Sequence, residues 1–164
     1  MSNIVLIGMP GAGKSTVGVI LAKVLGKNFI DSDLLIQEQE GMLLRDIIKK
    51  HGKQRYIDIE NRVNKNISVE NTVIATGGSV VYCSEAMEHF RNTAMVVYIK
   101  LSFDTINKRL GNIRKRGVVL REDQTLYDLY EERCPLYEKY AHITIDAEGF
   151  GIEELMEKIC LAVM

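Results

Sequence analysis

Short apolar runs alternate with longer amphipathic stretches along the whole chain. Apolar runs of four to eight residues are typical of buried strands, and apolar residues repeated at helical spacing predict the segments between them to be helices. Strands that are separated by helices need crossover connections, so the alternation predicts a parallel sheet with helices on both faces. The predicted strands are Asn3–Ile7, Lys27–Ile30, Thr72–Ala75, Ala94–Leu101 and Ile143–Asp146.

The predicted helices complete an α/β domain of three layers, α/β/α, that spans residues 1–164. Ligands of such folds bind at the carboxyl ends of the strands, so we expect the chemistry in the loops after Ile7, Ile30 and Ala75. The predicted helices are Ser15–Leu25, two helices within Leu34–His51 that separate at Gly41, Lys53–Ser68, Glu85–Arg91, Phe103–Leu110, Thr125–Tyr140 and Ile152–Met164.

The segment GMPGAGKS, from Gly8 to Ser15, matches the phosphate-loop pattern G-x-x-x-x-G-K-[ST] in full. Its glycines let backbone N–H groups point at phosphate oxygens, and the following helix directs its positive dipole end there. Lys14 adds a charge against the β- and γ-phosphates, and the Ser15 hydroxyl suits Mg²⁺. The motif predicts an ATP site and a P-loop kinase fold. The predicted nucleotide-binding residues are Gly11, Ala12, Gly13, Lys14, Ser15 and Thr16.

Two acids, Asp31 and Asp33, follow the second predicted strand. Alternate residues of extended backbone point the same way, so both carboxylates are expected in the cleft that holds the phosphates. One can organise Mg²⁺, which prefers carboxylate and water oxygens, and the other can accept a proton from an attacking hydroxyl. The alternative is that Asp33 only caps the next helix, because aspartate is a favoured N-cap residue.

Six segments together resemble the shikimate kinase family over nearly the whole chain. They are GMPGAGKST, FIDSDLLI, HGKQRYIDIE, ATGGS, RKRGVVL and EERCPLYEKYA. The third follows the outline of the family's G-E-x-x-F-R-x-x-E helix, and the fourth stands where the family has a glycine triplet. The resemblance implies phosphorylation of a shikimate hydroxyl by ATP.

The resemblance also implies roles for single residues. Asp31 would help to hold Mg²⁺, and Asp33 would bind the acceptor hydroxyls and assist proton removal. Arg109 would lie near the adenine, and Arg133 would bind the acceptor's carboxylate. The acceptor site would further include Gly77 and Gly78, through their backbone N–H groups, and Ser79.

Three positions depart from the family pattern. Ile57 stands where the family has a helix arginine that shares the acceptor's carboxylate. Ser79 replaces the third glycine of the triplet, and Gly117 replaces the lid proline. Ile57 lies about 100° from the centre of the helix's apolar stripe, so it is not an obvious core residue. Loss of one of two guanidinium clamps weakens carboxylate binding or indicates a different hydroxylated acceptor. A basic neighbour that compensates through a shifted helix is the third possibility.

Residues 111–122 are polar, basic and poorly periodic, and they contain Arg114, Lys115 and Arg116. A solvated loop without a ligand is one interpretation. Kinases must exclude water from the γ-phosphate, so we expect a mobile lid here. Arg116 would meet the phosphate charge when this lid closes.

Composition narrows the classes of partner. Net charge is −1 and no long apolar segment is present, so nothing indicates nucleic acid or a membrane as a partner. The three cysteines, Cys83, Cys134 and Cys160, have no metal-ligand spacing and are typical of reduced thiols in a cytoplasmic protein. We expect a monomer. A nucleoside monophosphate kinase and a nucleotide-binding regulator without transfer activity are the weaker alternatives.

Overall fold

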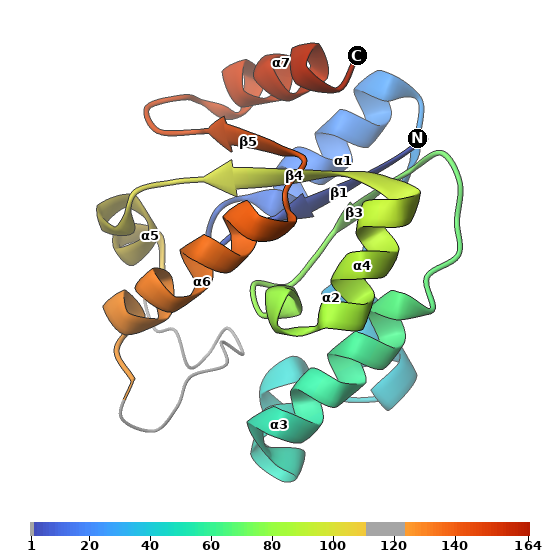
Figure 1. The fold of residues 1–164 in the computed structure, drawn as a ribbon, viewed down its shortest axis with the longest axis vertical. Coiled ribbons are helices and arrows are strands. Elements are labelled where there is room, and N and C mark those ends of the chain that lie inside the picture. Colours follow the sequence, from blue (N-terminus) through green and yellow to red (C-terminus); the bar gives the residue numbers. More distant parts are fainter. Residues whose placement is uncertain (1, 111–123) are drawn as a thin grey trace.

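A central sheet lies between two layers of helices in the computed structural model, which describes residues 2–110 and 124–164 (Figure 1). The strand order is β2-β3-β1-β4-β5, and every neighbouring pair is parallel. The predicted α/β fold with a five-stranded parallel sheet is therefore confirmed. The strands are β1 (Asn3–Ile7), β2 (Asn28–Asp31), β3 (Thr72–Ala75), β4 (Ala94–Lys100) and β5 (Ile143–Asp146).

Helices cover both faces of this sheet. Helices α1 and α7 pack together on one face, while α4 and α6 contact β4 on the other (Figure 1). In the described residues, no helix is both long and apolar enough to cross a bilayer. The helices are α1 (Lys14–Leu25), α2 (Ser32–Glu40), α3 (Leu44–Lys65), the short 3-10 helix η1 (Val80–Tyr82), α4 (Ser84–Thr93), α5 (Phe103–Arg109), α6 (Leu126–Tyr140) and α7 (Ile152–Val163).

Strand β1 lies at the centre of the sheet, and all five of its residues are consequently buried. It pairs with β3 on one side and β4 on the other, with Val5 opposite both Ile74 and Val96. A strand that is buried on both faces has a continuous run of apolar residues, and β1 was predicted from such a run. The carboxyl ends of β1, β2 and β3 consequently lie side by side, and the loops that follow them can meet.

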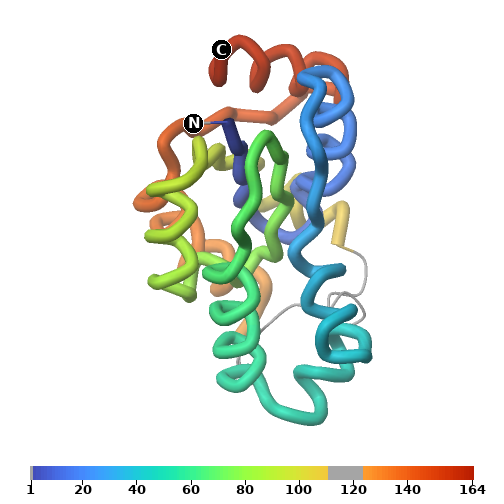
Figure 2. The backbone as a smooth tube through the Cα atoms, turned by 90° about the vertical axis from the view of Figure 1, so that its right-hand side faces the viewer, coloured from blue at the N-terminus to red at the C-terminus, as the bar shows by residue number. Residues whose placement is uncertain are grey.

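Helices α2 and α3 form the lower end of the molecule, away from the sheet (Figures 1 and 2). Their apolar faces build a second core cluster around Ile36, Ile47 and Tyr56, separate from the main core. Gly41 ends α2 in the left-handed conformation, with φ of 67°, as the predicted break required. Gly52 interrupts α3 with non-helical angles, φ 81° and ψ 164°. The predicted boundary between the helix that ends at His51 and the helix that starts at Lys53 is therefore a kink within α3. Helix α3 ends at Lys65 rather than at Ser68.

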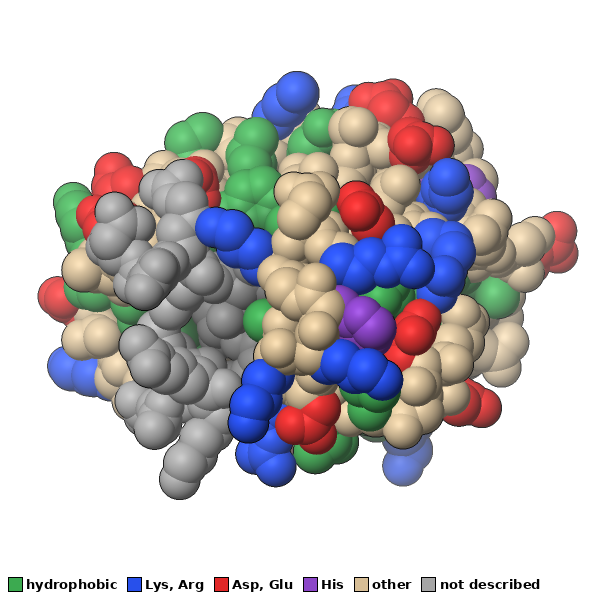
Figure 3. All heavy atoms as spheres, turned by 90° about the horizontal axis from the view of Figure 1, so that it is seen from below, with side chains coloured by type: hydrophobic (Ala, Val, Ile, Leu, Met, Phe, Trp, Pro, Cys, Tyr) green, Lys and Arg blue, Asp and Glu red, His purple; other side chains and the backbone are tan. Residues whose placement is uncertain are grey.

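The first half of α3 presents a basic surface at that end of the molecule. Figure 3, viewed from below, shows Lys, Arg and His side chains gathered there. Because the chain as a whole carries a net charge of only −1, this is a local excess of positive charge. The exposed basic residues of this half-helix are Arg45, Lys49, Lys50, His51, Lys53 and Arg55.

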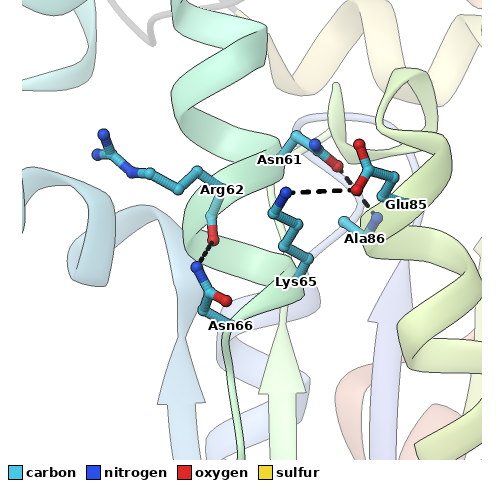
Figure 4. A network of polar contacts seen from close by, with 6 residues as sticks. All are labelled: Asn61, Arg62, Lys65, Asn66, Glu85 and Ala86. Carbon is cyan, nitrogen blue, oxygen red and sulfur yellow. Dashed lines mark hydrogen bonds and ion pairs between the residues drawn. The ribbon is translucent and has the colours of Figure 1, made fainter.

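Helix α3 is fastened to the start of α4 by the contacts in Figure 4. Cys83 precedes α4 and makes no side-chain cap, but Asn61 Oδ1 accepts a hydrogen bond from the Ala86 backbone N–H at 3.1 Å. The side-chain amide oxygen of Asn61 on α3 thereby pairs with a backbone N–H that has no partner within the first turn of α4. Lys65 and Glu85 add an exposed ion pair at 3.3 Å.

We expect Asn61→Ala to lower the free energy of unfolding by about 1 kcal/mol, as for the loss of an N-terminal cap. The matched control is Lys65→Ala, which removes the exposed ion pair of the same helix contact and should change stability little. Urea denaturation of both variants measures the difference. Equal losses in the two variants would show that Asn61 has no capping role.

Candidate active site

The loop between β1 and α1 has the strand–loop–helix context that a phosphate loop requires. Gly8 approaches the neighbouring strand so closely that a Cβ there would lie 2.7 Å from the Ile99 carbonyl oxygen. Gly13 precedes α1 with φ of 89°, a left-handed conformation that glycine adopts without strain. The loop therefore curls as the motif predicts, and α1 begins at Lys14, one residue earlier than expected.

Lys14 lies at the base of this loop and is only 7% exposed. Its ammonium group donates hydrogen bonds to the carbonyl oxygens of Gly8 at 2.6 Å and Met9 at 2.9 Å. Burial lowers the pKa of Lys14 to about 8, although Asp33 opposes that shift. The side chain thus stays cationic at neutral pH, and the carbonyl oxygens of the phosphate loop hold it in place.

Asp31 and Ser15 join the second strand to the phosphate loop. The Ser15 hydroxyl donates to Asp31 Oδ2 at 2.7 Å. The other oxygen, Oδ1, accepts from the backbone N–H groups of Asp33 at 3.0 Å and Leu34 at 3.2 Å, so Asp31 is the N-cap of α2. The alternative that Asp33 caps this helix is wrong, because the chain turns into the helix one residue after Asp31.

The Ser15–Asp31 pair fits Mg²⁺ by its donor chemistry. A hydroxyl and a carboxylate lie within hydrogen-bond distance of each other beside the phosphate loop. Mg²⁺ takes few protein ligands, prefers oxygen, and completes its shell with waters and substrate phosphates. The oxygens at this position therefore match what the ion needs in a kinase, and the Mg²⁺ role of Ser15 and Asp31 stays a prediction.

Asp33 lies in the first turn of α2 and lines the cavity beside Lys14. Burial, with a further contribution from the Asp31 charge, raises the pKa of Asp33 to about 6. Its Oδ1 is shielded from solvent and accepts no hydrogen bond from the described residues. A carboxylate with this pKa is ionised at neutral pH and basic enough to receive a proton.

The loop after β3 packs against Asp33 through a glycine. A Cβ at Gly77 would lie 2.5 Å from Asp33 Oδ1, so any other residue would displace the carboxylate. Thr76 fixes the start of this loop, because its hydroxyl donates to the Leu6 carbonyl oxygen at 2.7 Å. The β3 loop is thereby tied to the strand that leads into the phosphate loop.

The next glycine packs against Arg133 of α6. A Cβ at Gly78 would lie 2.9 Å from a guanidinium nitrogen of Arg133 and 2.6 Å from Pro10. Tyr137, also on α6, donates a hydrogen bond to the Gly78 carbonyl oxygen at 2.7 Å. Arg133 is 1% exposed, yet it lines the cavity. The two glycines therefore sit between a carboxylate and a guanidinium that come from distant parts of the chain.

One cavity of about 620 Å³ connects the phosphate loop with this second group of residues. Arg109 joins the loop side, where its guanidinium donates to the Gly11 carbonyl oxygen at 3.1 Å. Within the loop, Ala12 is buried, and Asp31 contacts the Ser15 hydroxyl. The predicted site residues that line the cavity are Gly11, Gly13, Lys14, Ser15, Thr16, Asp33, Gly77, Gly78, Ser79, Arg109 and Arg133.

Arg116 and the predicted lid, residues 111–122, lie outside the described residues. Ile57 is half-buried and packs against the second core cluster, while Leu44 and Tyr56 are the apolar α3 residues that line the cavity.

Glu60 is a buried carboxyl group that sequence analysis placed on a helix but assigned no role. Ser79 donates its hydroxyl to Glu60 Oε1 at 2.6 Å, so the residue in place of the third glycine is anchored from behind. Burial, with the Asp33 charge next, raises the pKa of Glu60 to about 8. Glu60 is therefore mainly protonated at neutral pH. Only the pairing of α3 with the β3 loop reveals this contact, although Glu60 stands at the last glutamate of the family's helix pattern.

A phosphate loop with its lysine, an adjoining hydroxyl–carboxylate pair and a basic carboxylate in one cavity define a P-loop phosphotransferase. Residues 10–163 match the family model for shikimate kinase. A shikimate kinase of Thermodesulfovibrio yellowstonii is 40% identical over 97% of this chain and 93% of its own, and one of Caldanaerobacter subterraneus is 36% identical over 99% and 96%.

Solved structures agree with these relatives. A shikimate kinase from Acinetobacter baumannii in complex with shikimate is 33% identical and covers 98% of this chain and 92% of its own, with a TM-score of 0.91. The shikimate kinase of Aquifex aeolicus is also 33% identical, over 98% and 95% of the two chains, with a TM-score of 0.86. The chain belongs to the shikimate kinase family, whose members are ATP-dependent small-molecule kinases. The resemblance inferred from the motifs is confirmed, and a different acceptor is not favoured.

The raised pKa of Glu60 predicts how stability depends on pH. The folded state binds the Glu60 proton more tightly than the unfolded chain, so the free energy of unfolding falls as pH rises from the ordinary glutamate pKa toward about 8. Between pH 6 and 8, we expect the natural protein to lose about 2 kcal/mol more than Glu60→Gln, which does not titrate. Urea denaturation at the two pH values measures this difference in the free energy of unfolding.

The control is Glu38→Gln, which removes an exposed carboxylate on α2 and should keep the natural pH dependence. A Glu60→Gln protein with that same dependence would contradict the assignment.

Proposed function

We propose that this protein transfers the γ-phosphoryl group of MgATP to a hydroxyl group of shikimate. The observation that carries the proposal is the cavity itself, which is lined by the phosphate-loop lysine Lys14, by Asp33 and by Arg133. Shikimate offers hydroxyl groups for the carboxylate and a carboxylate for the guanidinium. The similarity to a kinase structure solved with shikimate supports the same acceptor.

On the nucleotide side, the loop N–H groups and Lys14 hold the β- and γ-phosphates, while Arg109 lies where the adenosine leaves the loop. Ser15 and Asp31 would hold Mg²⁺, which neutralises charge on the β- and γ-phosphate oxygens when it is bound. Asp31 is already fixed by its cap contacts with α2. Lys14 is held by the carbonyl oxygens of Gly8 and Met9, so its positive charge is preorganised and costs no reorganisation during the reaction.

On the acceptor side, Asp33 accepts the proton of the attacking hydroxyl. The hydroxyl oxygen forms a bond to the γ-phosphorus, the bond from that phosphorus to the β–γ bridging oxygen breaks, and ADP leaves with the electron pair. Arg133 binds the acceptor's carboxylate and sets which hydroxyl faces the phosphate. The backbone N–H groups of Gly77 and Gly78 complete the acceptor wall, and Arg116 keeps its predicted role at the transferring phosphate.

The proposal also covers the cellular compartment, the domain organisation and the oligomeric state. The three cysteines are free thiols, which supports action in the cytoplasm. The sheet uses strands from Asn3 to Asp146, and the cavity uses residues from Pro10 to Arg133, which supports one domain over residues 1–164. We propose that this domain acts as a monomer.

Lys14→Ala should lower kcat/KM for ATP by about a hundredfold or more, because a preorganised charge on the phosphates is lost. Release of ADP, coupled to an indicator reaction with shikimate as acceptor, measures the effect. Lys23→Ala, an exposed lysine later on α1, is the control and should retain natural activity. Near-natural turnover by Lys14→Ala would contradict the site assignment.

Asp33→Asn keeps the shape of the side chain but removes its charge and its basicity. We expect kcat to fall by about a hundredfold or more, while ATP binding changes little. The same assay, run over an acceptor panel of shikimate and other hydroxy acids, also tests the acceptor. Asp46→Asn, an exposed aspartate on α3, serves as the control. An unchanged kcat in Asp33→Asn, or a faster reaction with another acceptor, would count against the proposed function.

A further inference from the structure

Tyr82 contacts the acceptor-side arginine in two ways, and neither follows from the motifs. It lies on η1, three residues after Ser79, and is half-buried. Its hydroxyl oxygen accepts a hydrogen bond from Arg133 Nε at 3.3 Å. Its ring lies against the same guanidinium, with the central carbon 5.2 Å from the ring centroid. A hydrogen bond and a cation–π contact thus act on one charged group.

The direction of the tyrosine hydroxyl is set by a third residue. Tyr82 donates its single proton to Glu132 Oε2 at 2.5 Å. The lone pairs of the hydroxyl oxygen are then left to face Arg133 Nε, because a phenol has one proton to give and can accept as well. Glu132 and Arg133 are consecutive on α6, so Tyr82 joins η1 to this helix by two hydrogen bonds beside the guanidinium.

The far side of Arg133 is limited by the Gly78 backbone. A guanidinium nitrogen lies where a Cβ of Gly78 would be only 2.9 Å away, and Tyr137 holds that glycine by its carbonyl oxygen. The arginine side chain is therefore enclosed between Tyr82 and the β3 loop, in a position that still lines the cavity. A long side chain held in this way loses little further freedom when it binds a ligand.

Arg133 is also the cation best placed for an acceptor's carboxylate. Among the described residues that line the cavity, the cations are Lys14, Arg109 and Arg133, and the first two contact the phosphate loop. Position 57 carries isoleucine, whose side chain packs into the second core cluster. Within the described part of the chain, the orientation of the Arg133 guanidinium then decides how well the carboxylate is bound.

We propose that Tyr82 is a positioning residue that orients Arg133 for the acceptor's carboxylate and thereby sets the affinity for the acceptor. This inference rests on the proposed function, since it takes shikimate as the acceptor. Tyr82 acts through Arg133 and has no part in the transfer of the phosphoryl group. Its removal consequently affects binding of an acceptor that carries a carboxylate, and leaves kcat and the affinity for ATP nearly unchanged.

The test compares Tyr82→Phe with the natural protein. This variant keeps the ring beside the guanidinium and removes the hydroxyl alone. Tyr130→Phe is the matched control, because it removes a tyrosine hydroxyl on α6 that donates to the Leu101 carbonyl oxygen at 2.7 Å, on the side of the helix packed against β4. For each protein, KM and kcat are measured with shikimate and with its methyl ester, and titration calorimetry gives the Kd of shikimate without turnover.

We expect Tyr82→Phe to raise both KM and Kd for shikimate about tenfold or more, as for loss of a hydrogen bond to a charged group. With the methyl ester, which lacks the charge, the variant and the natural protein should have the same KM within about twofold. Tyr130→Phe should bind shikimate as the natural protein does.

Unchanged KM and Kd in Tyr82→Phe would overturn the inference and leave the proposed function standing. An equal rise with the acid and the ester, or an equal rise in Tyr130→Phe, would also overturn it, because the effect would not act through the carboxylate. A natural protein that neither binds nor phosphorylates shikimate would instead overturn the proposed function, and the inference with it.

Discussion

The close packing of two glycines between opposite charges is the constraint on which the active site depends. Gly77 brings the β3 loop against Asp33, and Gly78 brings the same loop against Arg133. Neither position has room for a Cβ. This allows the carboxylate of Asp33 in the first turn of α2 and the guanidinium of Arg133 on α6, one hundred residues apart in the chain, to face one cavity. The Thr76 hydroxyl bond to β1 then sets this assembly beside the phosphate loop.

Burial of several ionisable groups in one place gives the site its electrostatic character. Desolvation disfavours every charge there, so it lowers the pKa of Lys14 and raises those of Asp33 and Glu60. The two raised pKa values give the two carboxyl groups different roles. Asp33, at about 6, stays ionised at neutral pH and serves as a base, whereas Glu60, at about 8, keeps its proton and acts as a neutral support behind Ser79. Proximity to the cavity alone does not make a carboxyl group catalytic.

The sequence predicted the features that local patterns encode. Strand β1 and the phosphate loop were predicted because an apolar run followed by a glycine-rich turn is a contiguous signal. The break at Gly52 was predicted as a boundary between two helices, and the structure has a kink there. The cap at Asp31 was missed, since either aspartate fits a cap preference. Tyr82 and Glu60 were not predicted to support the site because their partners are distant in sequence and meet only through the packing of α3, η1 and α6.

The central claim is that this cavity joins a nucleotide site to a hydroxy-acid site for direct phosphoryl transfer. The measurement that tests it most directly is phosphorus NMR of the natural protein mixed with MgATP and shikimate. The account predicts that ADP and a new phosphate monoester, coupled to a ring proton of shikimate, accumulate in equal amounts. Inorganic phosphate as the only other product, or no loss of ATP, would contradict it.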